Sequence, residues 1–335
     1  MPSTIDLDGT ALPVPGFGAM GLSAFYGPTD LEQSKKTLRK AIEIGCTFWN
    51  TADMYGKGAN EELIGSPRIS LTLLNYRSGN RWTDIEKTGK SRGTIAAFVI
   101  DGSPEYAAEA IDSSIARMGG IKPDAWIVHR IDKDVAIEET VKAMDKERKA
   151  GKCKYIGLSE CSASTLRRAA AVAKITFVEV EYSPWTTTME ENGVLAAAAE
   201  LDIIVLAYSP LGRGFLTGKY SSVEDFGPDN AFRQGLPRMQ KENWDKNYRL
   251  VEEFQKIAAK KGCTSGQLSL AWLMAQPGKI LPIPGTKSEK YLIENFAARD
   301  VQLSESDIAE IRAAMDANQP VGERYAEAGM KGLDH

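Results

Sequence analysis

The hydrophobic and polar positions form two kinds of segment. Short apolar runs alternate along the chain with longer amphipathic segments. The short runs predict buried strands at 46–49, 124–128, 154–158, 177–182, 203–208 and 279–283. Apolar residues three or four apart predict helices at 31–44, 105–118, 137–150, 163–173, 194–201, 247–261, 265–275, 289–298 and 305–316. Strands alternating with helices about eight times predict a parallel sheet, and that number of units fits an α/β fold of the (β/α)8 TIM-barrel type.

The two ends of the chain add to this barrel. Residues 5–12 predict an N-terminal β-hairpin around Asp8-Gly9, a strong two-residue turn signal. Extra helices follow the last strand, and residues 318–335 form a polar C-terminal tail. We expect a single domain over 1–317, with no change of composition inside it. No early predicted strand is followed by a glycine-rich turn of the Gly-x-Gly-x-x-Gly type. This argues against an open sheet that binds a dinucleotide.

The region of the third strand is atypical. A helix starts near Glu61, with Asn60 as its expected cap, and residues 66–80, SPRISLTLLNYRSGN, interrupt it. We expect this segment to be a mobile excursion beside the rim, with partly exposed Leu71, Leu73 and Leu74, and residues 93–98 to be a truncated third strand. An alternative is that 66–80 is an artefact of the gene model, such as retained noncoding sequence.

Composition narrows the functional class. The chain has 335 residues, of which 43% are hydrophobic and 26% charged, and a net charge of -4, which argues against nucleic acid or anionic membrane as partners. No apolar run approaches the roughly 18 residues that span a bilayer, and the N-terminus does not look like a signal peptide, so we expect a cytoplasmic protein. Four scattered cysteines and two histidines predict no metal site. The sequence leaves the oligomeric state open.

Polar residues follow the predicted strands, and a barrel collects such strand exits on one face. Tyr55 can donate a proton and His129 can orient a carbonyl, which suits carbonyl reduction or alcohol oxidation. The same sequence is also compatible with roles outside catalysis, in which Tyr55 lies in a surface loop and His129 is a structural residue. The loop 284–288 lies before a helix and offers backbone N–H groups and a cation to an anion.

Four motifs carry a resemblance to a known family. They are GLSECS at 157–162, EYSPW at 181–185, AYSPLGRGFLTG at 207–218 and PGTK at 284–287. In this order they resemble the aldo-keto reductases, in particular the branch of fungal and bacterial aryl-alcohol and pyridoxal reductases, and the match runs from about residue 4 to 316. The resemblance implies a barrel capped by the hairpin, which binds NADPH across its carboxyl rim and reduces small aldehydes or ketones.

The resemblance also assigns roles to residues. Tyr55 matches the general acid and His129 its helper, and Asn50 stands where the family has an aspartate. The cofactor-binding residues it implies are Ser159, Glu160 and Glu179 near the nicotinamide, Tyr208 stacked on its ring, Ser209, Pro210, Leu211 and Arg213 at the pyrophosphate, and Gly285, Thr286, Lys287, Glu294 and Asn295 at the adenosine end. Lys287 would pair with the 2′-phosphate and favour NADPH over NADH.

Three departures from the family pattern bear on activity. Asn50 replaces the aspartate, Glu179 replaces a glutamine, and the lysine of the third strand is missing, with Ala97 near its expected place. Without the ammonium we expect Tyr55 to be a weaker proton donor, and Asn50 to be the less costly residue because no lysine is there to compensate a buried aspartate. The prediction is therefore a weakened reductase; the alternative is a catalytically weak NADPH-binding protein with a redox-sensing or regulatory role.

Overall fold

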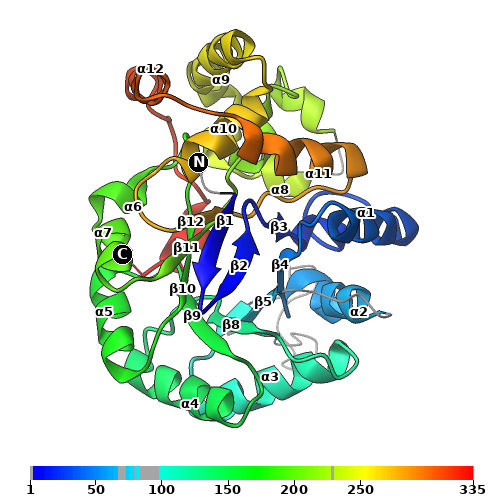
Figure 1. The fold of residues 1–335 in the computed structure, drawn as a ribbon, viewed down its shortest axis with the longest axis vertical. Helices are drawn as coiled ribbons and strands as arrows, with labels where there is room; N and C mark the ends of the chain where they lie inside the picture. The colour runs from blue at the N-terminus through cyan, green and yellow to red at the C-terminus, as the bar shows by residue number, and fades with distance from the viewer. Residues whose placement is uncertain (1–2, 67–72, 79, 83–97, 228–229, 335) are drawn as a thin grey trace.

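Eight strands form one parallel sheet, in the order β12, β11, β10, β9, β8, β5, β4, β3 (Figure 1). The computed structural model describes residues 3–66, 73–78, 80–82, 98–227 and 230–334, with the backbone alone at 73–78, 80–82, 98–99 and 328. The strands are β3 (Phe17–Gly18), β4 (Phe48–Ala52), β5 (Leu73–Ser78), β8 (Ala125–Val128), β9 (Tyr155–Ser159), β10 (Phe177–Glu181), β11 (Ile204–Tyr208) and β12 (Ile280–Pro282). Apart from β3 and β5, they lie where the apolar runs predict strands.

The two outer strands of this sheet meet and close it into a barrel. The amide of Gly16 donates to the carbonyl of Pro282 at 2.9 Å, and the amide of Gly18 donates to that of Pro284 at 3.1 Å. The backbones approach so closely that a Cβ on Gly18 would lie 2.7 Å from the carbonyl oxygen of Ile283. The predicted barrel is confirmed, and glycine is what allows this seam between β3 and β12 to form.

The N-terminal hairpin lies across one end of the barrel (Figure 1). Strands β1 (Thr4–Leu7) and β2 (Thr10–Pro13) pair antiparallel, and Asp8 and Gly9 make the turn with φ of 49° and 83°. Ile5 and Leu12 pack in one buried cluster with Phe48, Phe177 and Ile204, which stand at the starts of their strands. Because the amino end of the barrel is filled in this way, the carboxyl end is the one available for a site.

Helices cover the outside of the barrel (Figure 1). They are α1 (Leu31–Glu43), α2 (Ala59–Gly65), α3 (Pro104–Arg117), α4 (Ile137–Lys149), α5 (Ala163–Val172), α6 (Thr188–Glu191), α7 (Val194–Glu200), α8 (Ala231–Gln234), α9 (Lys241–Lys261), α10 (Ser265–Met274), α11 (Glu289–Phe296), α12 (Glu305–Ala317) and α13 (Glu327–Lys331). Their starts follow local capping chemistry. Asp30 accepts the amides of Glu32 and Gln33, and Thr264 and Ser304 form capping boxes. In the part of the chain that is described, no helix combines the length and apolar character needed to cross a bilayer.

Two predicted elements need correction. Helix α9 begins at Lys241 rather than at 247, because Trp244, which is 4% exposed, packs into the core and extends the amphipathic face. Helix α2 has Gly58 as its N-cap rather than Asn60, which lies inside the helix.

The third strand is the main correction to the sequence analysis. Strand β5 pairs in parallel with both β4 and β8, with Asn75 level with Asn50 on one side and Ala125 on the other. Residues 73–78 therefore supply the strand between β4 and β8, and the expectation that 66–80 is an excursion and that 93–98 provides this strand was wrong. A parallel barrel needs a strand between β4 and β8, and the apolar run around Leu73 supplies it.

The rest of this region forms a small separate ladder. Strand β6 (Asn80–Trp82) pairs antiparallel with β7 (Phe98–Ile100), so Phe98 belongs to this ladder and not to the barrel. Leu71 and residues 93–97, Ala97 among them, lie outside the described residues, as do the side chains of Leu73 and Leu74, whose exposure was expected.

Candidate active site

Tyr55 and His129 lie together at the carboxyl end of the barrel. Tyr55 opens the 3-10 turn Tyr55–Gly58 after β4, and His129 directly follows β8. Their rings stand edge to face, with centroids 6.2 Å apart and an interplanar angle of 87°. Both side chains are buried, at 2% and 5% exposure. The structure thus brings together the two residues that the sequence selects for proton transfer.

Polar contacts fix the turn that carries Tyr55. The side-chain amide of Asn60 donates to the carbonyl of Ala19 at 2.9 Å and to the hydroxyl of Ser23 at 2.7 Å. Its oxygen accepts the hydroxyl of Thr51 at 2.6 Å. Asp53, which follows β4, accepts the amide of Met54 at 2.7 Å. Asn60 therefore ties α2 to the strand exits, a role that its helix-start context in the sequence does not suggest.

Asn50 and Glu179 meet across the barrel interior. The amide nitrogen Nδ2 of Asn50, on β4, donates to Oε2 of Glu179, on β10, at 2.8 Å, and the two side chains are 1% and 0% exposed. In the sequence, these residues are two separate departures from a family pattern. The structure joins them in one carboxylate–amide contact, so the partner of Asn50 is Glu179. Pairing across a barrel depends on the closed fold, which a sequence window does not contain.

Aromatic side chains cover the Tyr55 side of the site. The ring of Phe25 lies 6.5 Å from that of Tyr55 and 5.5 Å from that of Phe232, while Tyr26 stands 5.6 Å from Phe232. Phe25 is 36% exposed and adopts a φ of 67°, which few non-glycine residues do. Sequence reasoning missed this cover, because Phe25 stands in an irregular loop and Phe232 in the four-residue helix α8, which is too short to show periodicity.

Ser159 is the last residue of β9 and Glu160 is the next residue in the chain, but their surroundings differ. Ser159 is fully buried, and its hydroxyl oxygen has no hydrogen-bond partner among the residues that the structure describes. A buried polar atom of this kind fits a site that a polar group of a cofactor completes. Glu160 accepts the amide of Glu181 at 2.9 Å and the guanidinium of Arg324 at 2.9 Å. Burial would raise the pKa of the Glu160 carboxyl, but Arg324 and Arg130 beside it hold that pKa at about 2.

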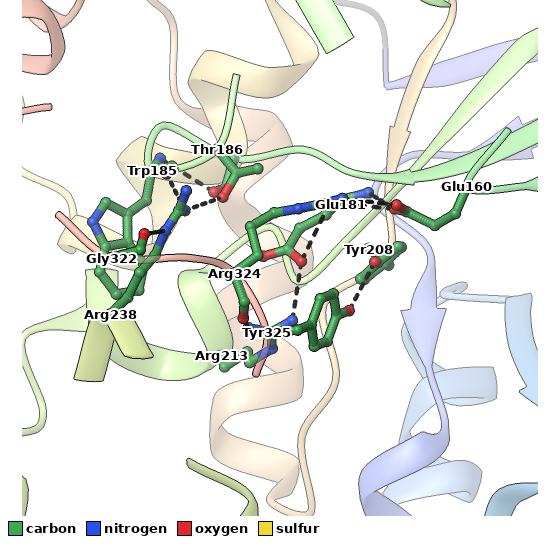
Figure 2. Close-up of polar contacts among 11 residues, drawn as sticks. Glu160, Glu181, Trp185, Thr186, Tyr208, Arg213, Arg238, Gly322, Arg324 and Tyr325 are labelled. Atoms are coloured by element: carbon green, nitrogen blue, oxygen red, sulfur yellow. Dashed lines mark hydrogen bonds and ion pairs between the residues drawn. The ribbon is translucent and has the colours of Figure 1, made fainter. Parts of the chain in front are cut away.

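The C-terminal segment completes a polar network over β9, β10 and β11. Figure 2 shows Arg324 and Tyr325 directed at this edge. Nη2 of Arg213 donates to Glu181 at 3.0 Å, and Nη1 of Arg213 donates to the carbonyl of Arg324 at 3.2 Å. The hydroxyls of Tyr208 and Tyr325 are 2.9 Å apart. Arg324 is 6% exposed, so a residue of the predicted polar tail is buried in the site; its sequence context, among charged and small residues, carries no signal of this.

The loop after β11 turns sharply back on itself. Ser209, Gly212 and Arg213 have φ of 49°, 55° and 57°, and the amide of Gly212 donates to the carbonyl of Ser209 at 2.9 Å. Pro210 and Leu211 lie within this turn, and Leu211 is buried at 9% exposure. Burial raises the pKa of the Tyr208 hydroxyl well above its usual value, so Tyr208 is a neutral ring at the site's edge.

Lys287, in the loop between β12 and α11, contacts the loop that carries Phe25. Its ammonium donates to the carbonyls of Tyr26, Gly27 and Pro28 at 2.8, 3.1 and 2.8 Å. Burial and the nearby Arg233 lower the pKa of this ammonium. The sequence assigns Lys287 to a phosphate; the structure adds that it anchors the loop 26–28.

The other predicted adenosine-end residues surround Lys287 in the chain. Thr286 accepts the amide of Ser288 at 3.1 Å, and Gly285 contributes to the seam. Glu294 accepts the hydroxyl of Thr264 at 2.8 Å, which ties α11 to the start of α10. Asn295 is buried at 7% exposure.

A closed parallel barrel with polar side chains gathered at its carboxyl edge is the arrangement typical of barrel enzymes. The model of the Aldo/keto reductase family matches residues 16–316 of the chain. The chain belongs to this family and is therefore an oxidoreductase, as the sequence motifs predict.

Several known proteins are similar to this chain over most of its length. "Aldo-keto reductase yakc [NADP(+)]" from Schizosaccharomyces pombe is 46% identical over 321 residues, which are 94% of this chain and 92% of that protein. An aldo-keto reductase from Gibberella moniliformis is 41% identical and covers 96% of each chain. The structure is also similar to glycerol dehydrogenase AKR11B4 from Gluconobacter oxydans, with a TM-score of 0.84 over 97% of this chain and 99% of that one. At 20% identity, the last likeness concerns the fold alone.

Proposed function

We propose that this protein reduces small aldehydes and ketones with NADPH, at the site around Tyr55. The observation that carries the proposal is the buried Tyr55–His129 pair, which offers a proton donor and a second hydrogen-bonding ring in one place. The S. pombe relative, whose name specifies NADP(+), supports the choice of cofactor. The unsatisfied hydroxyl of Ser159 supports its location, since an amide group there would complete the hydrogen bonding.

The cofactor and the residues of the site have separate roles in the proposed reaction. NADPH, when bound, supplies the hydride. Tyr55 donates the proton to the carbonyl oxygen of the substrate, and His129 orients that oxygen. Phe25 and Phe232 keep water away and present apolar ring faces and edges, which favour aromatic or apolar aldehydes over charged ones.

We also propose that turnover is slower than a full catalytic set would give. The third strand, Leu73–Ser78, has the sequence LLNYRS and contains no lysine, while Asn50 is neutral. Loss of one positioned electrostatic helper typically costs about 10²–10³ in rate. The same observation favours the second candidate, a weak catalyst that binds NADPH in a redox-sensing or regulatory role.

Substitution of Tyr55 tests the proposal. With NADPH and a reactive aromatic aldehyde, Tyr55→Phe should lower kcat/KM by about 10² or more, because the proton donor is removed. NADPH affinity, measured by fluorescence titration, should remain the same, since the phenyl ring keeps its packing. Tyr248→Phe, on the outer helix α9, is the matched control and should leave both quantities unchanged.

The outcomes separate the candidates. Retained activity in Tyr55→Phe would refute the assigned proton donor. NADPH binding without measurable aldehyde reduction by the unaltered protein would favour the regulatory role. The same titrations with NADH test Lys287: Lys287→Ala should weaken NADPH binding more than NADH binding, whereas exposed Lys290→Ala should not.

A further inference from the structure

The C-terminal segment places a buried cation between two buried carboxylates at the candidate site. Nη2 of Arg324 lies 2.9 Å from Oε2 of Glu160, and its Nη1 lies 3.6 Å from Oε2 of Glu181 (Figure 2). These side chains are 7%, 2% and 4% exposed. Glu160 directly follows Ser159, the residue with the unsatisfied hydroxyl. The ion pairs therefore lie beside the proposed place of the nicotinamide.

The fold holds this segment in place on both sides of Arg324. The amide of Val321 donates to the side chain of Asn247 at 2.8 Å, and the guanidinium of Arg238 donates to the carbonyl of Gly322 at 3.0 Å. Tyr325 lies against Tyr208, with their hydroxyls 2.9 Å apart. Arg324 thus occupies its position because its neighbours in the chain are tethered, and its charge is a fixed part of the site.

The charges around this point come from several elements. Glu160 follows β9, Glu179 and Glu181 lie on β10, Arg130 follows β8, and Arg213 lies in the loop after β11. Arg324 comes from the C-terminal segment, so removing it leaves the local sum one unit more negative. Removing Glu160 makes the sum one unit more positive. Because these groups are buried, water and salt screen the change weakly.

We propose that Arg324 is a positioning residue that, by neutralising Glu160 and Glu181, sets the preference of the site between NADPH and NADP⁺. The proposal rests on the proposed function, which places the nicotinamide at this edge. The nicotinamide ring carries a positive charge in NADP⁺ and none in NADPH, so a more negative site favours the oxidised form. Because a buried unit charge at this edge is weakly screened, its removal should change such a preference by about tenfold.

Two substitutions of opposite sign test this inference. The measured quantity is the ratio of the Kd of NADP⁺ to the Kd of NADPH, from quenching of tryptophan fluorescence at fixed ionic strength. Arg324→Gln should lower this ratio by about tenfold, and Glu160→Gln should raise it by a similar factor. The double variant should return to within about twofold of the unaltered protein. Arg324→Lys keeps the charge and should keep the ratio, and Arg167→Gln, at an exposed ion pair with Glu200, should also leave it unchanged.

A merely structural role of Arg324 would give a different result. Loosening of the site would weaken both cofactor forms together, and would leave the ratio unchanged in both single variants; this outcome, or shifts of the same sign, would overturn the inference alone. Failure of both forms to bind the unaltered protein would overturn the proposed function and the inference with it. If Arg324→Gln does not fold, Glu160→Gln and Arg324→Lys still decide, because their expected ratios differ.

Discussion

The contact between Asn50 and Glu179 shows how a single hydrogen bond sets what the barrel interior tolerates. Two carboxylates at this 2.8 Å contact would repel each other, and one of them would have to take up a proton. An amide facing the carboxyl group avoids this, since Nδ2 of Asn50 donates to its oxygen Oε2. The identity of either residue therefore depends on the other.

This dependence can be measured by exchanging the amide of Asn50 and the carboxyl group of Glu179 between the two positions. Asn50→Asp should destabilise the protein at neutral pH by about 3 kcal/mol, because it buries a second carboxylate against Glu179. Combining it with Glu179→Gln should recover most of that loss, since the glutamine amide can donate to the aspartate. Urea unfolding of the four proteins gives the coupling free energy, which should exceed about 1 kcal/mol. Additive effects would mean that the two side chains do not depend on each other.

Individual site residues differ in how far the sequence reveals them. Tyr55 comes a few residues after an apolar run and His129 directly after another, so a local pattern places both at strand exits on the same face. Arg324 is different, because nothing near it in the chain indicates where a tail residue docks. The Asn50–Glu179 contact likewise depends on barrel closure. A local pattern thus predicts the residues that a strand delivers, while those that another part of the chain brings in need the structure.

At the scale of elements, regular alternation made most strands and helices predictable. Helices such as α1 and α12 have both an amphipathic pattern and a capping residue, so independent signals agree. Strand β5 lacked this agreement, because the chain on both sides of it does not show the usual helix pattern. Its place follows from its neighbours, β4 and β8, each of which needs a partner.

A proline in β5 tests its place in the sheet. Tyr76 is paired on both sides, opposite Thr51 and Trp126, so Tyr76→Pro should remove a ladder hydrogen bond and cost about 3 kcal/mol or more. Ala136→Pro is the control, because Ala136 is exposed and already has a φ of -59° at the start of α4. Thermal unfolding should show a large loss for the first variant and little for the second. Tolerance of Tyr76→Pro would restore the view of 66–80 as an excursion.

For the whole molecule, the seam between β3 and β12 is the feature on which closure depends. The number and alternation of strands and helices predict a barrel. They do not show how the first and last strands of its sheet meet. The structure shows that they meet at glycines, where a Cβ on Gly18 would lie 2.7 Å from the carbonyl oxygen of Ile283.

Alanine at this point should therefore open or strain the barrel. We expect Gly18→Ala to destabilise the protein by about 2 kcal/mol or more, since the facing atom is backbone and has no rotamer to change. Gly266→Ala, on α10, where a Cβ would lie 3.7 Å from its nearest neighbour, Cγ2 of Thr217, should be neutral or stabilising. Melting temperatures of the two variants provide the comparison, and equal values would contradict a tight seam.

The seam also bears on how the chain reaches its folded form. Neighbouring strands such as β8 and β9 meet after a short crossover, but Gly16 and Gly18 find Pro282 and Pro284 only when nearly the whole barrel lies between them. The entropy of closing a loop grows with its length, so this contact can form only late. Until it forms, β3 and β12 each have one unpaired edge, and an open edge accepts a strand from another molecule. Aggregation during folding therefore competes with closure of the ring at these two pairs of residues.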